Sequence, residues 1–293
     1  MFGILVDSIS KIVAFYGGYI INYDYLCRQI LDKPDMLNYK TYENIPGAKW
    51  VVMIHGAGGN MEVWYKQISE YSRHFNLLLV DLACHGDSNK KEVFSTSFDF
   101  DMAARQVLEV VDHLGIDKAH FVGLSLGSII AHAVVKMAPE RAYSMVLVGA
   151  VTCLSAMMRT LFGFVRTFRR VLPFAVIKRL LADAIIPQQK YSASKNLFLR
   201  CAQKVTFDGF MQWMGLLSIA DGYIRHLVRE ERVIPTLYVM GEDDRLFLSN
   251  VRSLVESSGD NVSLSIIQNA GHVCNVDNKD EFNRVSLGFL TQC

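Results

Sequence analysis

From residue 50 onward, short apolar runs alternate with longer stretches of helical periodicity. The apolar runs lie at residues 51–54, 77–80, 119–122, 145–148, 236–240 and 263–267. The helical patterns occupy residues 61–75, 100–114, 128–137, 246–257 and 279–291. Strands that are apolar on both faces must be covered on both sides, and intervening helices allow parallel pairing. We therefore expect an α/β fold with a mostly parallel central sheet and helices on both faces.

The pattern changes between residues 151 and 230, where no run resembles a strand. This stretch has helical periodicity and is rich in Met, Phe, Leu and Arg. It is predicted to be a helical cap, or lid, inserted into the α/β core. Residues 49–150 and 231–293 would then form one core domain. Residues 1–48 are predicted to be an amphipathic helical segment that leads into it.

The first 22 residues are apolar, but Asp7 and Lys11 interrupt them. The uninterrupted run at residues 12–21 is too short to span a membrane as a helix, and no basic region or cleavage site indicates a signal peptide. Apolar residues recur at helical spacing, at positions 2, 5, 9, 12, 13, 16 and 20. This spacing predicts a helix that packs on the protein's own core or lid, or one that lies on a membrane surface.

Charge and cysteine content narrow the class of protein. The 293 residues carry a net charge of +1, which gives no reason to expect a nucleic-acid partner. The six cysteines lack the spacing of a zinc site or a redox pair, so they are expected to be reduced thiols. We expect a cytoplasmic protein, with peripheral contact at the inner face of a membrane as an open alternative, and neither a metal nor a cofactor.

A nucleophile motif lies where the run at 119–122 meets the helical pattern at 128–137. It is Gly123-Leu124-Ser125-Leu126-Gly127, a G-x-S-x-G sequence. At a sharp strand-to-helix turn the serine is held in a strained conformation, and residues without a Cβ relieve the crowding on either side. The serine hydroxyl then projects at a helix N-terminus, which favours developing negative charge. Ser125 is therefore the candidate nucleophile.

Four further motifs each follow a predicted strand. The first two are His55-Gly56-Ala57-Gly58-Gly59-Asn60 and Asp81-Leu82-Ala83-Cys84-His85-Gly86-Asp87-Ser88. The other two are Gly241-Glu242-Asp243-Asp244-Arg245 and Asn269-Ala270-Gly271-His272. The first motif contains neither G-K-[ST] nor G-x-G-x-x-G, so the nucleotide-binding interpretations of its glycines fail. Among eight histidines, His272 alone follows the final predicted strand, and it is the candidate general base.

With these motifs, the chain resembles the α/β-hydrolase superfamily, specifically members with a helical cap, over residues 49–150 and 232–293. The resemblance implies that Asp244, or less favourably Asp243, is the acid that orients His272. It implies that the backbone N–H groups of Ala57 and Leu126 form an oxyanion hole. The order nucleophile, acid, base matches this superfamily. Cys84 stands where the superfamily's second loop usually has a glycine, and His55 and His85 are expected to shape their loops.

A serine nucleophile predicts acyl transfer and, by the resemblance, argues against dehalogenases and epoxide hydrolases, which attack through a carboxylate. We expect a serine esterase or lipase that hydrolyses a lipid-like or medium-chain carboxylic ester. Six residues are predicted to contact substrate: His55, Gly56, Leu124, Met158, Phe162 and Trp213. The cap is apolar and carries six basic residues in its first half: Arg159, Arg166, Arg169, Arg170, Lys178 and Arg179. This basic surface would suit an anionic membrane or an anionic lipid, or be a solvated face of the cap.

Three other functions fit the same motifs. A carbon–carbon bond hydrolase of ring-cleavage products would share the cap and the order of the three catalytic residues. A receptor on this fold would bind a ligand with little turnover. An acyltransferase would require a site that excludes water and admits an alcohol acceptor.

Overall fold

The computed structural model describes residues 4–6, 12–16, 19–22, 36–89, 98–230 and 234–293. The chain divides into two compact units, Met1–Met36 and Leu37–Cys293, which are described separately below. No helix among the described residues is long and apolar enough to cross a membrane.

The described residues of the first unit form a small antiparallel sheet rather than the expected helix. Its strands are β1 (Ile4–Val6), β2 (Ile12–Tyr16) and β3 (Tyr19–Asn22), in the order β1-β2-β3. The prediction of an N-terminal amphipathic helix is therefore wrong for these residues, and so is the membrane-surface helix based on it. The runs IVAFY and YIIN are rich in β-branched and aromatic residues and are separated by two glycines, a combination that favours a hairpin.

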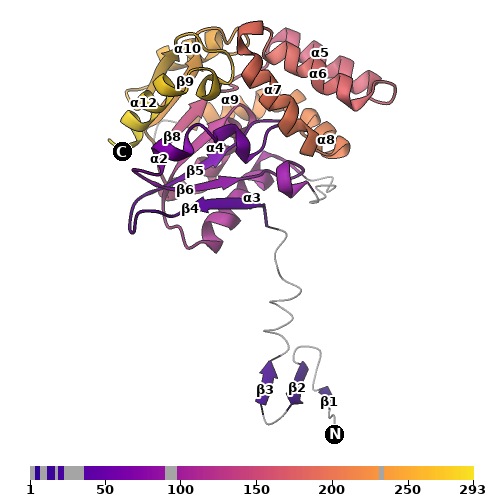
Figure 1. Cartoon of the computed structure of the whole chain (residues 1–293), viewed down its shortest axis with the longest axis vertical. Coiled ribbons are helices and arrows are strands. Elements are labelled where there is room, and N and C mark those ends of the chain that lie inside the picture. Colours follow the sequence, from indigo (N-terminus) through magenta and orange to yellow (C-terminus); the bar gives the residue numbers. More distant parts are fainter. Residues whose placement is uncertain (1–3, 7–11, 17–18, 23–35, 90–97, 231–233) are drawn as a thin grey trace. The chain divides into compact units, whose positions relative to one another are not determined.

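The second unit is built on a seven-stranded sheet of order β10-β9-β8-β7-β5-β6-β4 (Figure 1). All neighbours pair in parallel except β4 and β6, which are antiparallel. The strands are β4 (Tyr39–Tyr42), β5 (Trp50–Ile54), β6 (Asn76–Val80), β7 (Ala119–Leu124), β8 (Ala142–Val148), β9 (Thr236–Gly241) and β10 (Val262–Ile267). The expected mostly parallel α/β sheet is confirmed. The sheet begins at β4, ahead of the predicted start of the core at residue 49.

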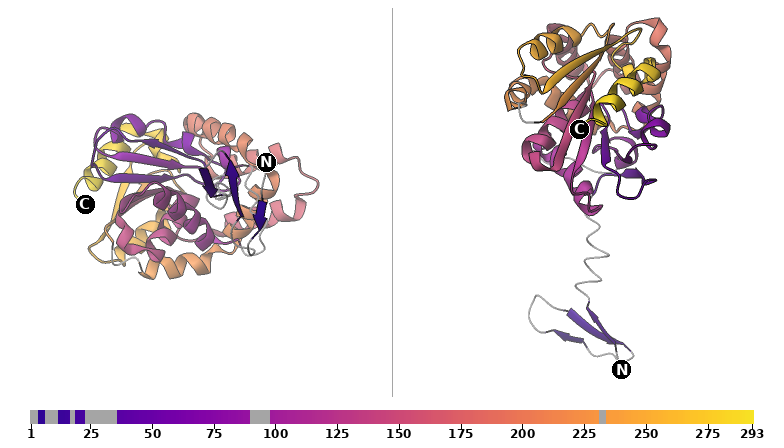
Figure 2. Two further views of the ribbon diagram at one scale, coloured as in Figure 1. Left: turned by 90° about the horizontal axis from the view of Figure 1, so that it is seen from below. Right: turned by 90° about the vertical axis from the view of Figure 1, so that its left-hand side faces the viewer.

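Helices cover both faces of this sheet (Figure 2). On one face α3 (Phe100–His113) packs against α4 (Leu126–Met137). On the other face lie α2 (Ile68–Tyr71), α11 (Cys274–Asp277) and α12 (Lys279–Leu290). Helix α10 (Leu248–Glu256) contacts β9 and β10. Side chains alternate between the two faces along β5, so Val51 and Met53 point to the same face. There they share one core cluster with Tyr71 of α2 and Phe282 of α12.

Between β8 and β9 the described chain is helical. Its helices are α5 (Ala156–Phe168), α6 (Phe174–Ile185), α7 (Ser192–Cys201), α8 (Phe207–Ser218) and α9 (Ala220–Glu230). We call α5–α9 the inserted helices. Figure 1 shows α5–α8 together at one end of the unit, with α5 and α6 forming a hairpin that projects from it. The buried residues Met158, Phe162 and Val165 show which side of α5 packs inward.

Candidate active site

Ser125 lies at the sharp turn between β7 and α4. Its φ angle is +53°, in the left-handed region that costs a residue with a side chain about 1–3 kcal/mol. The flanking glycines make this turn possible. A Cβ on Gly123 would lie 2.2 Å from the Gly127 carbonyl oxygen, and a Cβ on Gly127 would lie 2.2 Å from that of Ile54. Both positions therefore exclude every other residue, as the G-x-S-x-G pattern predicts.

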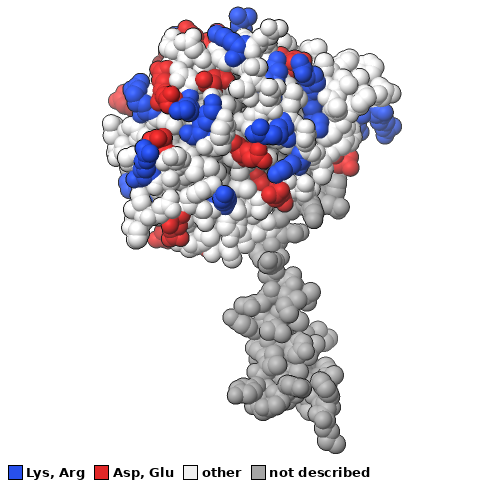
Figure 3. Space-filling model, viewed as in Figure 1, with Lys and Arg blue, Asp and Glu red and all other residues white. Residues whose placement is uncertain are grey.

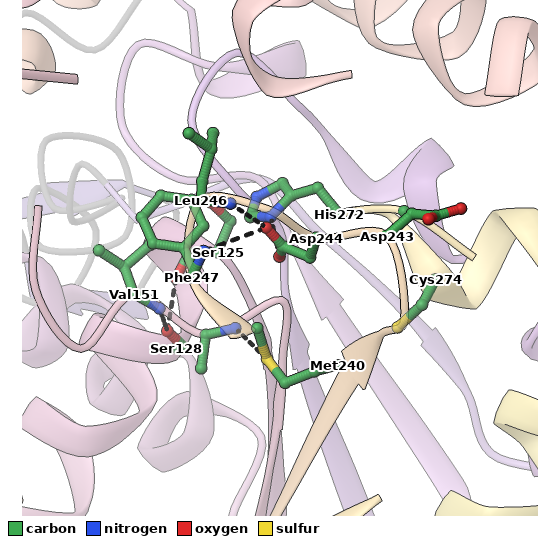
Figure 4. A network of polar contacts seen from close by, with 12 residues as sticks. Ser125, Ser128, Val151, Met240, Asp243, Asp244, Leu246, Phe247, His272 and Cys274 are labelled. Atoms are coloured by element: carbon green, nitrogen blue, oxygen red, sulfur yellow. Dashed lines mark hydrogen bonds and ion pairs between the residues drawn. The ribbon is translucent and has the colours of Figure 1, made fainter. Parts of the chain in front are cut away.

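Asp244 and His272 form a buried acid–base pair beside this turn (Figure 4). His272 Nδ1 lies 2.8 Å from Asp244 Oδ2. Because a carboxylate only accepts hydrogen bonds, this contact places the imidazole proton on Nδ1 and leaves Nε2 as an acceptor. The other carboxylate oxygen, Oδ1, accepts from the backbone N–H groups of Leu246 and Phe247 at 3.2 and 3.3 Å. The Phe247 ring packs on the imidazole, with ring centres 5.2 Å apart.

The adjacent carboxylate of Asp243 points away from His272 (Figure 4). Its Oδ2 atom accepts a hydrogen bond from the Tyr191 hydroxyl at 2.5 Å and forms an ion pair with Lys190 at 2.6 Å. The hydrogen bond from Lys190 lowers the pKa of the Asp243 carboxyl. The structure thus gives the two acids separate partners, and those of Asp243 are Lys190 and Tyr191.

A second contact ties the His272 loop to the inserted helices. The Asp277 carboxylate accepts hydrogen bonds from the Ser194 hydroxyl in α7 and, at 2.9 Å, from the backbone N–H of Gly271. Together with the Asp243–Tyr191 contact, it fixes the start of α7 against the loops that carry Asp244 and His272. We call these two contacts the α7 latches.

Two buried histidines hold the loop that follows β5. His55 Nε2 accepts from the Leu82 N–H at 2.9 Å, and His85 Nε2 accepts from the Gly58 N–H at 3.0 Å. Each Nδ1 contacts a backbone carbonyl oxygen, of Gly56 and of Ala83 respectively. Burial lowers the pKa of His55 to about 4 and that of His85 to about 3, so both rings are neutral near pH 7.

Cys84 adopts a φ angle of +65°, the conformation that glycine at this position would adopt without strain. Its side chain lies against Gly209 of α8, so closely that a Cβ added to Gly209 would be only 2.2 Å from the Cys84 Cβ. Trp213, one turn further along α8, donates from Nε1 to the Ala83 carbonyl oxygen at 2.9 Å. This part of α8 is therefore docked directly on the loop after β6.

Ser125 and His272 line the same cavity, which the inserted helices close from the other side. Residues of the core that line it are Gly56, Ala57, Gly59, Val63, Leu124, Ser125, Val151, Leu154, Phe247, His272 and Val273. Residues of the inserted helices and their connections are Met158, Phe162, Leu181, Ile185, Ile186, Ser194, Leu197, Phe198, Cys201, Phe210, Met214 and Leu217. No Lys, Arg, Asp or Glu side chain is among the described residues that line this cavity.

The structure brings most of the predicted site residues to this cavity. Of the six predicted substrate contacts, Gly56, Leu124, Met158 and Phe162 line it. His55 and Trp213 do not, because their ring nitrogens are engaged with loop backbone and both side chains are fully buried behind the wall. His55 and Trp213 therefore hold the loops that line the cavity and do not face its interior.

One predicted oxyanion donor, Ala57, follows Gly56, where an added Cβ would lie 3.1 Å from the Ser125 Cβ, and the other, Leu126, follows Ser125 in the chain. Ala57 lines the cavity in the loop after β5. Leu126 is the first residue of α4, so its backbone N–H has no acceptor within the helix. Among the described residues, no group of three or more His, Cys, Asp or Glu side chains could hold a metal ion.

Sequence periodicity missed several cavity residues. Phe247 and Val273 lie close in sequence to the candidate residues Asp244 and His272, so this proximity was the available signal. Ser194 and Cys201 lie in a helix with weak apolar patterning, and nothing in their local sequence marks them as cavity residues.

Comparison with known proteins agrees with this architecture. The family model described as the alpha/beta hydrolase fold matches residues 49–279. A pimeloyl-[acyl-carrier protein] methyl ester esterase of Aliivibrio fischeri is 25% identical over 83% of this chain and 93% of its own length. A 2-hydroxy-6-oxononadienedioate/2-hydroxy-6-oxononatrienedioate hydrolase of Pseudomonas putida is 26% identical over 83% of this chain and 88% of its own length. Against another curated relative, the chain spans only 64% of that protein's length.

The fold also matches solved structures. The enol-lactonase from Burkholderia xenovorans LB400 aligns with a TM-score of 0.73 at 21% identity, covering 87% of this chain and 96% of that one. A family match over residues 49–279 includes the Ser125 turn, the Asp244–His272 pair and all the inserted helices. The chain therefore belongs to the α/β-hydrolase family and is a hydrolase of that family.

Proposed function

We propose that this protein hydrolyses uncharged carboxylic esters with an apolar, lipid-like or medium-chain acyl group. One observation carries the proposal: the cavity that contains Ser125 and His272 is lined mostly by apolar side chains, and no Lys, Arg, Asp or Glu is among the described residues that line it. Burial of an acyl chain there would contribute about 0.8 kcal/mol for each CH₂ group. A carboxylate buried in the same place would have no cationic side chain to pair with, at a cost of several kcal/mol.

The reaction we propose is a two-step acyl transfer. Ser125 Oγ attacks the ester carbonyl carbon while His272 Nε2 accepts the hydroxyl proton, and the hydrogen bond to Asp244 stabilises the resulting imidazolium. The oxyanion accepts hydrogen bonds from the backbone N–H groups of Ala57 and Leu126. His272 then protonates the leaving alcohol. Water, deprotonated by the same imidazole, attacks the acyl-enzyme and releases the acid and Ser125.

The main competing function is hydrolysis of a carbon–carbon bond. The relative from Pseudomonas putida is named for a dienedioate, a substrate with two carboxylates. The cavity described here offers such a substrate neither Lys nor Arg. The relative from Aliivibrio fischeri is named for a methyl ester of an acyl chain, which is closer to the chemistry that this cavity favours.

The test uses a series of p-nitrophenyl esters from acetate to dodecanoate, together with a fluorophosphonate probe. We expect stoichiometric labelling of Ser125, multiple turnovers, and kcat/KM rising with acyl length until the cavity is filled. Ser125→Ala should abolish labelling and reduce kcat by about a thousandfold or more. Ser253→Ala, on the exposed surface of α10, is the matched control.

Four outcomes would contradict the proposal. Turnover by Ser125→Ala at a comparable rate would exclude the mechanism. Faster cleavage of a vinylogous diketone dicarboxylate than of any ester would favour the carbon–carbon bond reaction. Labelling without multiple turnover, or acyl transfer to an added alcohol in preference to water, would indicate a receptor or an acyltransferase.

A further inference from the structure

The hairpin formed by α5 and α6 carries an apolar surface that the fold leaves exposed. Of the eight large apolar side chains that are exposed among the described residues, six lie in this hairpin: Met157, Phe164, Phe168, Val171, Val176 and Leu180. We call these six the hairpin apolar surface. Val171 is 74% exposed, and Phe164 and Phe168 are 43% and 42% exposed. Such a concentration on one projecting element is typical of an interaction site.

This surface is separate from the side of the hairpin that faces the cavity. Along α5, the buried residues Met158, Phe162 and Val165 share one side of the helix. Phe164 and Phe168 lie one turn apart on another side and contact each other, with ring centres 4.7 Å apart. The inward side packs this helix against the rest of the unit, whereas the second apolar side stays partly exposed.

The charge on the hairpin restricts what can cover this surface. Residues 156–185 contain six basic residues and one acidic residue, Asp183. Arg166, Arg169 and Arg170 are exposed, and none of them has a carboxylate within ion-pair distance among the described residues. Figure 3 shows blue Lys and Arg side chains beside white surface over this part of the molecule. A partner must therefore be both apolar and anionic.

A second copy of the chain does not meet this requirement. Two hairpins docked face to face would bring their arginines together, and like charges that lack counter-ions oppose association. An anionic bilayer meets both conditions, because its phosphates pair with arginine and its interface accepts aromatic and branched side chains.

We propose that the α5–α6 hairpin docks on an anionic lipid bilayer. The hairpin apolar surface enters the boundary between head groups and acyl chains, and Arg166, Arg169 and Arg170 bind lipid phosphates. Contact is peripheral, since neither helix is long enough to cross the membrane. This inference does not depend on the proposed esterase activity, and its test does not measure activity.

The experiment is flotation of the full chain with vesicles of phosphatidylcholine, with or without phosphatidylglycerol. We expect binding to the anionic vesicles, weaker binding in high salt, and little binding to the neutral ones. The Arg169→Gln/Arg170→Gln variant should partition about thirtyfold less, the factor that corresponds to roughly 1 kcal/mol per basic side chain. Arg252→Gln/Arg284→Gln, which removes the same charge from exposed positions on α10 and α12, is the control.

Phe168→Ser tests the contribution of the hairpin apolar surface to vesicle binding. Tyr65→Ser is its control, because Tyr65 is 52% exposed and lies outside the hairpin. Phe168→Ser should reduce partitioning at every salt concentration, and Tyr65→Ser should not. Thermal unfolding of each variant verifies that it is folded. Equal losses in the hairpin and control variants would overturn the proposal. So would a failure to bind anionic vesicles, including the case in which the protein instead forms a dimer that Phe168→Ser dissociates.

Discussion

The contact between Cys84 and Gly209 gives a sharp prediction about how the inserted helices dock on the core. A Cβ at Gly209 would lie 2.2 Å from the Cys84 Cβ and 2.6 Å from its Sγ, so Gly209→Ala forces α8 or the loop to move. Overpacking of this kind costs about 1–3 kcal/mol, against a gain in helix propensity of about 1 kcal/mol. Because the overlap involves a Cβ held by backbone, we expect a cost near the upper end of this range, about 3 kcal/mol, and hence a net loss of about 2 kcal/mol in the free energy of unfolding.

Gly215 provides a control in the same helix. A Cβ there has no atom within 4 Å, so Gly215→Ala should stabilise the protein by up to about 1 kcal/mol. Cys84→Gly removes the obstructing atoms and also the strain of the +65° φ angle. It should therefore rescue much of the Gly209→Ala defect. The rescue is incomplete because Thr206 Oγ1, which caps α8, would still lie 2.8 Å from the new Cβ.

Urea unfolding of the wild type, the three single variants and the double variant, followed by tryptophan fluorescence, measures these effects. We expect a coupling free energy of about 1–2 kcal/mol between positions 84 and 209. Additivity within about 0.5 kcal/mol, or equal effects of Gly209→Ala and Gly215→Ala, would refute the reasoning.

Further predictions follow from the site. Asp244→Asn should lower kcat by about 10³–10⁴-fold because it favours the wrong imidazole tautomer, whereas Asp243→Asn should lower kcat less than tenfold. Steady-state kinetics measures both effects, and similar losses would reject Asp244 as the residue that orients His272. The histidines at 55 and 85 have folded pKa values of about 4 and about 3, below the unfolded 6.5. The free energy of unfolding should have its full value above pH 6.5 and fall progressively as the pH drops toward 4. In His85→Asn this dependence on pH should be weaker, and an unchanged dependence in urea titrations would contradict the prediction. Met214→Trp should narrow the cavity and shift the ester preference toward shorter acyl chains, and an unchanged chain-length profile would contradict the cavity assignment.

The strands of the main sheet and the active-site loops could be predicted because their constraints are local. Buried parallel strands are apolar throughout, and the Ser125 turn requires glycine at 123 and 127 for steric reasons found within five residues. The choice of Asp244 over Asp243 needed more than local sequence, since only the fold shows Lys190 and Tyr191 beside the second acid.

The errors arose where a pattern was ambiguous or a partner was distant in sequence. An almost entirely apolar N-terminus satisfies helical spacing as readily as strand alternation, and the two glycines between the runs were the better guide. Strand β4 reads Tyr-Lys-Thr-Tyr, which is too polar for a buried strand, yet it pairs at the edge of the sheet. Trp213 was predicted to contact substrate because it lies in the apolar cap, but its indole donates a hydrogen bond to a carbonyl 130 positions away.

The α7 latches have a consequence for recombination among relatives. The inserted helices look like an exchangeable module because they occupy one continuous stretch between β8 and β9. However, Tyr191 and Ser194 form hydrogen bonds with Asp243 and Asp277, which lie outside that stretch and close in sequence to Asp244 and His272. A chimera that replaced only the helices would leave two carboxylates beside the catalytic loops without their hydroxyl partners. The unit that can be transferred intact therefore consists of the helices, both carboxylates and the loop around Cys84 on which Gly209 and Trp213 dock.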